Sequence, residues 1–136
     1  MSEAPIGIAA AVIVREDGRT LLVRKRGTSA FMQAGGKAVA RESAVEALAR
    51  ELREELGCEV AADPRPLGRF CAPAANEAGR MVEAELFAVH LAGDIAAGAE
   101  IEELAWIDPD APGDILLAPL TRDHVLPLVR KLWRDR

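Results

Sequence analysis

The strongest constraint on the fold is a segment with the pattern of a capped amphipathic helix, from Ser43 to Gly57. Ser43 followed by Glu46 has the spacing of a capping box, in which each side chain accepts a backbone N–H of the other residue. Gly57 stands where a left-handed C-cap is expected. Between these caps, apolar residues recur at helical intervals and predict the buried stripe: Val45, Leu48, Ala49, Leu52 and Leu56.

The chain before this helix has the pattern of a β-hairpin. Ile6 to Val14 is a short apolar run rich in β-branched residues, and Leu21 to Arg26 is a second extended run. Asp17-Gly18 between them supplies turn chemistry. We therefore expect the two runs to pair as antiparallel strands, followed by a flexible glycine pair, Gly35-Gly36, before the helix.

The chain after the helix predicts further strands and a terminal helix. Strands are expected over residues 67–71, 81–91 and 104–107. The last helix should begin near Asp123, because Pro127 is tolerated only near a first turn. This order predicts one mixed α/β (α+β) domain over residues 1–136, with helices on both sides of a sheet.

Composition limits the classes of function. The chain has 136 residues, 50% of them hydrophobic, and a formal net charge of -5. It is therefore long enough for one core, and it has no basic footprint for nucleic acid or an anionic membrane. The apolar start follows Glu3 and not a basic segment, so we expect a cytoplasmic protein. Cys58 and Cys71 match neither a disulfide framework nor a metal-binding spacing.

Three acidic residues lie together on one side of the predicted helix, Glu51, Glu54 and Glu55. Their mutual repulsion and their position near the helix C-terminus are both unfavourable, so positive charge should lie nearby. On charge pattern alone the favoured interpretation is a solvated face, balanced by Arg50 and Arg53. The alternative is a divalent cation, Mg²⁺ or Mn²⁺, which prefers oxygen ligands and bridges carboxylates to phosphates.

A longer pattern around these acids decides between the two interpretations. From Gly36 the sequence GKAVARESAVEALARELREELGC resembles the Nudix box: glycine, five residues, Glu, seven residues, then Arg-Glu-aliphatic-x-Glu-Glu-x-Gly-aliphatic. The matching positions are Gly36, Glu42, Arg50, Glu51, Leu52, Glu54, Glu55 and Gly57. Cys58 departs from the final aliphatic residue, which is a mild change because cysteine is small and usually buried. Ala34 replaces a proline that many members carry before the glycine pair.

The resemblance implies a three-layer α/β/α sandwich with a mixed β-sheet, and a metal site within it. Glu51, Glu54 and Glu55 would hold Mg²⁺ (or Mn²⁺) together with the carbonyl of Gly36. Glu42 and Arg50 would form an ion pair that braces the loop against the helix. Glu100, with Glu77 as second candidate, would add a carboxylate from a later loop, and either Glu51 or Glu100 would take the proton from water.

Basic residues beside the box are candidate contacts for substrate phosphates: Arg24, Arg26 and Lys37. Alternation along a strand places Arg24 and Arg26 on one face and Lys25 on the other. Solvated edge charges are an equally good interpretation of all of them. His90 and His124 have no Ser or Cys partner at a recognisable spacing, and we interpret both as structural or surface residues.

The resemblance implies hydrolysis of a pyrophosphate bond in a nucleoside-diphosphate-linked small molecule. The compact length favours a nucleoside or deoxynucleoside triphosphate as substrate. ADP-ribose is the alternative, because Pro73 lies fifteen residues after Cys58, the placement associated with ADP-ribose pyrophosphatases. A non-catalytic nucleotide-sensing module is a further alternative, opposed by the retention of every box carboxylate. A homodimer is a candidate assembly.

Overall fold

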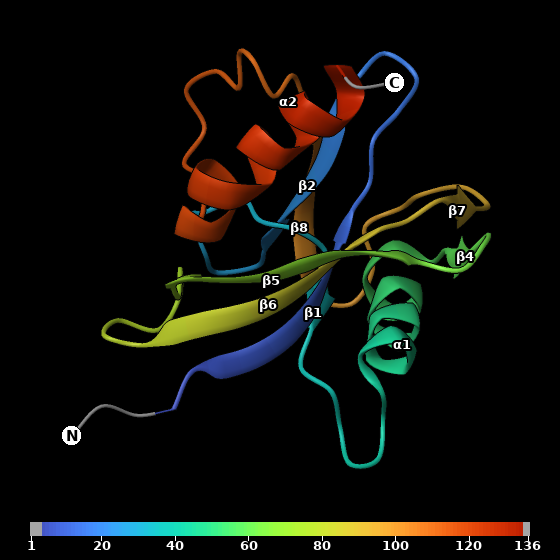
Figure 1. The fold of residues 1–136 in the computed structure, drawn as a ribbon, viewed down its shortest axis with the longest axis vertical. Helices are drawn as coiled ribbons and strands as arrows, with labels where there is room; N and C mark the ends of the chain where they lie inside the picture. The colour runs from blue at the N-terminus through green and yellow to red at the C-terminus, as the bar shows by residue number, and fades with distance from the viewer. Residues whose placement is uncertain (1–3, 135–136) are drawn as a thin grey trace.

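The computed structural model describes residues 4–134, and its helices lie on opposite sides of a β-sheet (Figure 1). The elements in chain order are β1 (Ile6–Val12), β2 (Thr20–Lys25), β3 (Gly35–Gly36), α1 (Ala44–Leu56), β4 (Glu59–Val60), β5 (Arg65–Pro73), β6 (Met81–Ala88), β7 (Leu91–Ala92), β8 (Ile101–Ile107), the π-helical turn η1 (Thr121–Val125) and α2 (Leu126–Arg134). The central sheet has the order β3-β1-β6-β5. It is mixed, because β1 and β6 are parallel while the other pairs are antiparallel. The predicted α/β/α arrangement is confirmed.

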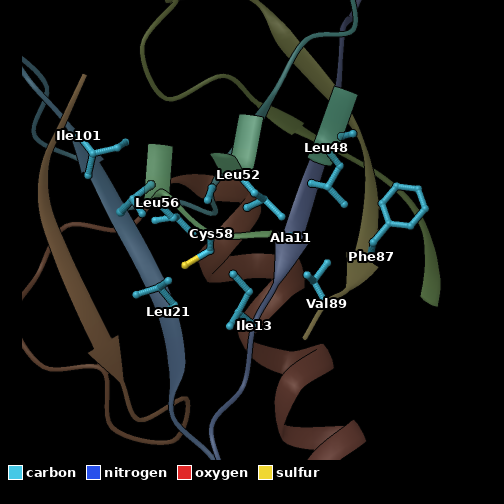
Figure 2. Packing of buried hydrophobic residues seen from close by; sticks show 13 residues of the cluster. Ala11, Ile13, Leu21, Leu48, Leu52, Leu56, Cys58, Phe87, Val89 and Ile101 are labelled. Atoms are coloured by element: carbon cyan, nitrogen blue, oxygen red, sulfur yellow. The ribbon is translucent and has the colours of Figure 1, made fainter. Parts of the chain in front are cut away.

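Strand β1 separates two apolar cores. Successive side chains of a strand point to opposite faces of its sheet. Ala9 and Ala11 accordingly belong to the core beneath α1, while Ala10 and Val12 belong to the core beneath α2. The α1 core also contains Cys58, which is buried among Ile13, Leu52 and Leu56 and their neighbours (Figure 2). The departure from the box at Cys58 is therefore accommodated as packing.

The predicted hairpin of the first two strands is wrong in its pairing. The chain turns as expected, and Val14 and Thr20 form an isolated antiparallel bridge beside the turn. Beyond that bridge the strands separate, because β1 pairs with β3 and β6 while β2 pairs with β8. The local turn signal was correct, but distant strands supply the partners. The three later strands are present, with residues 81–91 interrupted between β6 and β7.

Helix α1 has both predicted caps, but its buried face is rotated from the predicted stripe. The reciprocal Ser43–Glu46 capping box is present, and Gly57 is left-handed with φ of 68°. Val45, however, is 40% exposed, whereas Ala47 and Glu55 are buried. The Glu55 carboxylate accepts the backbone N–H of Gly35 at 3.1 Å. This hydrogen bond holds Glu55 on the buried face of the helix. The periodicity of apolar residues in the sequence gives no information about such a polar contact.

The terminal helix starts earlier than predicted. Helical residues begin at 119, not near Asp123, and run through the π-helical turn η1 into α2. In η1 the N–H of Leu126 donates to the carbonyl of Thr121, a wider turn than the α-helical one. Pro127 follows directly, and its ring would clash with the carbonyl four residues earlier in a regular α-helix. The wider turn explains how a helix continues past this proline.

None of the helices within residues 4–134 is both long and apolar enough to cross a membrane.

Candidate active site

The glycine pair lets the loop of β3 lie between β1 and α1. Gly35 and Gly36 pair with Ala10 and Ala9 of β1. A Cβ atom added to Gly35 would meet the backbone oxygen of Ala9, and the φ of Gly35 is 149°. A Cβ atom added to Gly36 would lie 2.7 Å from the carboxyl carbon of Glu51. Only residues without side chains allow the backbone to approach both neighbours so closely.

The three helix carboxylates differ in environment. Glu54 is 53% exposed, Glu51 is 17% exposed and Glu55 is buried at 6%. Burial raises the pKa of Glu55 to about 7, against the opposing effects of the Gly35 N–H and the charge of Lys25. Neutralisation of a buried carboxylate by a proton is one response to desolvation, and a nearby cation is another. Glu55 therefore lies where added positive charge is most stabilising.

Arg50 ties the loop, the helix and one acidic residue together. Its guanidinium donates to both carboxylate oxygens of Glu42, at 2.7 and 3.0 Å, and to the carbonyl of Lys37 at 3.0 Å. It also donates to Oε1 of Glu51 at 2.8 Å. A bidentate guanidinium–carboxylate pair fixes orientation as well as distance. The Glu42–Arg50 ion pair that the resemblance implied is thus present, and it includes Glu51.

The Glu42–Arg50 ion pair predicts a specific loss of stability in acid. Hydrogen bonds from Arg50 and Val39 lower the pKa of Glu42 from its ordinary value of 4.5 to about 2. Its stabilising effect is therefore complete above pH 4.5 and is lost as the pH falls toward 2. We expect urea unfolding of Glu42→Gln to change less between pH 5 and pH 3 than that of the wild-type protein. Equal acid sensitivity in the two proteins would refute this assignment.

A later loop caps the C-terminal end of α1 and carries Glu100 to the site. The N–H groups of Ala96 and Gly98 donate to the carbonyls of Leu56 and Glu55, at 3.1 and 2.9 Å. Gly98 passes so close that an added Cβ atom would lie 2.7 Å from the carbonyl oxygen of Glu54. These bonds satisfy carbonyl groups that a helix end leaves unpaired. The loop is thereby fixed against the helix two residues before Glu100.

A cavity of about 610 Å³ collects most of the predicted residues. Its acidic and basic lining comprises Lys25, Lys37, Arg50, Glu51, Glu54, Glu55, Glu77 and Glu100, with Gly35 and Gly36 between them. Its apolar lining includes Ile6, Ile8, Val82, Ala118 and Leu120. Glu77 also forms an ion pair with Arg80 at 3.6 Å. Charged groups and a largely apolar wall therefore share one concave site, as expected for a small-molecule pocket.

The structure does not bring Arg24 and Arg26 into this cavity. Arg24 pairs with Glu103 at 3.0 Å, and Arg26 pairs with Glu102 at 3.4 Å. Lys25, on the other face of β2, lines the cavity instead. The strand alternation had already separated Lys25 from the two arginines. The sequence did not indicate which of the two faces of this strand lies toward the carboxylates of α1.

The donor set fits a hard divalent cation. The candidate ligands are carboxylate oxygens from α1 and the carbonyl of Gly36, the oxygen chemistry that Mg²⁺ and Mn²⁺ prefer. The missing side chain at Gly36 leaves the loop in contact with the Glu51 carboxylate. Within residues 4–134 no three His, Cys, Asp or Glu side chains are already gathered around one point. The candidate ligands therefore have the chemistry that these cations prefer, and one oxygen of Glu51 accepts a hydrogen bond from Arg50.

Comparisons with known proteins agree with this geometry. The family model of the NUDIX domain matches residues 5–129. The MutT NUDIX hydrolase of Burkholderia pseudomallei is similar in structure, with a TM-score of 0.74 and 24% identity over 95% of this chain and 98% of that one. The solution structure of the E. coli ORF135 protein gives a TM-score of 0.69 and 28% identity, covering 95% of this chain and 89% of that one.

The crystal structure of a UDP-X diphosphatase has a TM-score of 0.78 and 21% identity to this chain. The match covers 99% of this chain and 66% of that one. The search of curated proteins gave no match. The family match spans nearly the whole described chain and contains the site. The chain therefore belongs to the Nudix hydrolase family, whose members hydrolyse pyrophosphate bonds.

Proposed function

We propose that this chain, acting as a single domain over residues 1–136, hydrolyses a nucleoside or deoxynucleoside triphosphate in the cytoplasm. The observation that carries the proposal is the 610 Å³ cavity, whose lining combines carboxylates and lysines with apolar side chains. A nucleotide likewise combines a charged phosphate chain with a flat base. The net charge of -5 also favours a small substrate with local charge compensation over nucleic acid.

Glu51, Glu54, Glu55 and the carbonyl of Gly36 are the groups proposed to hold Mg²⁺ or Mn²⁺. When bound, the cation supplies charge neutralisation and lowers the pKa of water. Lys25 and Lys37 line the cavity and would bind phosphate oxygens. We assign proton removal from water to Glu100, because one oxygen of Glu51 already accepts a hydrogen bond from Arg50 at 2.8 Å.

The charge of Lys25 is expected to act mainly in substrate binding. Lys25→Met keeps most of the side-chain volume and removes one phosphate contact. We expect KM to rise about tenfold while kcat changes less, which steady-state kinetics at saturating Mg²⁺ would measure. Arg24→Met on the opposite face of the same strand is the matched control, and equal effects of the two variants would contradict the assignment.

ADP-ribose is the second candidate substrate, and one feature favours it. A neighbouring pocket of about 340 Å³ shares Ala75 and Asn76 with the main cavity. Pro73, the residue whose spacing suggested this class, also lines the main cavity. A ligand longer than a nucleoside triphosphate would extend from the cavity into this pocket.

A substrate panel separates these alternatives. We expect Mg²⁺-dependent release of a nucleoside monophosphate from nucleoside triphosphates, and slower or no cleavage of ADP-ribose, NADH and dinucleoside polyphosphates. Chromatography of the products identifies the bond that is cleaved, and EDTA should abolish release. Faster cleavage of ADP-ribose would establish the second candidate. Tight nucleotide binding with no turnover on any member would favour a sensing module.

A further inference from the structure

Gln33 and Thr121 form a polar pair in the wall of the cavity. Both residues line the cavity, and both are buried. The hydroxyl of Thr121 donates to Oε1 of Gln33 at 2.8 Å. Thr121 itself is held by η1, where its carbonyl accepts the N–H of Leu126. One end of the Gln33 amide is therefore fixed by a residue whose own position is fixed by the helix.

The other end of this amide has no partner in the protein. Among residues 4–134, Nε2 of Gln33 makes no hydrogen bond, although Gln33 is only 6% exposed. A buried donor without an acceptor costs roughly 1–3 kcal/mol. Such groups are rare in folded proteins and call for a specific explanation. Because Gln33 lines the cavity, a molecule that fills the cavity can supply the missing acceptor.

The pair is associated with the apolar part of the lining. Leu120 precedes Thr121 and packs in the core beneath α2 with Ile8 and Val82, which also line the cavity. The charged part of the lining comprises the carboxylates of α1 with Lys37 and Lys25, whose charge acts on Glu55. If phosphates occupy the charged part, as the proposed function requires, the base of the nucleotide lies against the apolar part. A neutral amide donor there matches a neutral acceptor on a base.

We propose that Gln33 is a specificity-determining residue whose amide N–H donates to a carbonyl oxygen of the nucleobase, with Thr121 positioning it. The inference rests on the proposed function for the placement of the base. Guanine presents the O6 acceptor where adenine presents an amino donor. A donor at Gln33 therefore favours guanine over adenine, and it favours a base with this oxygen over the same base without it.

Binding of monophosphates without metal tests the pair directly. The probes are guanosine 5′-monophosphate and 2-aminopurine riboside 5′-monophosphate, which lacks O6, measured by calorimetry in EDTA. We expect the wild-type protein to bind the guanosine probe about tenfold more tightly, the effect of one matched buried hydrogen bond. In Gln33→Met the ratio should fall to near one. A ratio that survives in Gln33→Met, or that is absent in the wild-type protein, overturns the proposal.

A double variant guards against a folding defect. Gln33→Met leaves the Thr121 hydroxyl without its acceptor, whereas Gln33→Met with Thr121→Val removes both polar groups and keeps their approximate shape. We expect its melting temperature to match that of the wild-type protein and its binding ratio to be near one. Thr20→Val is the matched control, because it removes another buried hydroxyl, bonded to Ile13, outside the cavity. It should keep the tenfold ratio.

The same measurements distinguish this inference from the proposed function. Binding in EDTA does not depend on hydrolysis. A protein that shows the Gln33-dependent ratio but cleaves no triphosphate would retain the inference and lose the proposed activity. Normal cleavage of triphosphates with equal binding ratios in the wild-type protein and Gln33→Met would retain the proposed activity and overturn the inference about Gln33.

Discussion

Replacing Glu54 with glutamine should reduce kcat by about 10³-fold or more while leaving the fold intact. The change keeps the size of the side chain and removes the charge proposed to bind the cation, whose contribution to catalysis amounts to several kcal/mol. The fold should tolerate it, because Glu54 is 53% exposed and its nearest ion pair, with Arg50, is 3.5 Å long. Exposed pairs of this kind contribute roughly 1 kcal/mol or less.

Two measurements make the Glu54 result specific. Titration with Mn²⁺ alone should show weaker binding in Glu54→Gln, independently of any substrate. Glu59→Gln is the matched control, because Glu59 is also exposed, lies outside the cavity lining and pairs with Arg53 at 3.5 Å. It should retain both turnover and Mn²⁺ affinity. Near-normal turnover in Glu54→Gln would remove Glu54 from the ligand set.

Replacing Gly36 with alanine should impair activity far more than stability. The new Cβ atom would lie 2.7–2.9 Å from the carboxylate atoms of Glu51, so this carboxylate must move. Because it is the end of a flexible side chain, the fold can adjust at little cost, but the proposed ligand is displaced. We expect kcat to fall about 10²-fold, the scale of a loss from misplaced catalytic groups. The melting temperature should change by only a few degrees.

The neighbouring glycine provides the contrast. In Gly35→Ala the obstacle is the backbone of Ala9 within the sheet, and the φ of 149° is unfavourable for alanine. Backbone strain and overpacking each cost roughly 1–3 kcal/mol, so Gly35→Ala should be clearly destabilised in urea. If Gly36→Ala kept wild-type activity, or lost as much stability as Gly35→Ala, the proposed role of the loop would be wrong.

Local sequence signals predicted the parts of the fold that are held by neighbouring residues. The caps at Ser43 and Gly57 are correct because a helix end is stabilised within a few residues of itself. The pairing of the first strands was wrong because their partners, β6 and β8, lie far along the chain. The start of the last helix was wrong because a π-helical turn, which has no simple sequence signal, accommodates Pro127.

The residues of the candidate site also fall into those that a local sequence pattern identifies and those that only the structure identifies. Glu51, Glu54 and Glu55 were recognisable because they occupy one helix at a characteristic spacing. Lys25 was missed as a cavity residue because alternation along a strand gives two faces and does not say which one meets the site. Gln33 was missed because its significance arises only in three dimensions, where Thr121 satisfies one end of the amide and leaves the other unpaired.

The alternation along β1 has a consequence for the dynamics of the protein. Because Ala9 and Ala11 pack beneath α1 while Ala10 and Val12 pack beneath α2, undocking either helix exposes part of the same strand. The two helical layers should therefore open together, and the amide hydrogens of β1 should exchange with solvent only through global unfolding. The glycine loop rests on this strand, so its geometry persists for as long as the whole domain remains folded.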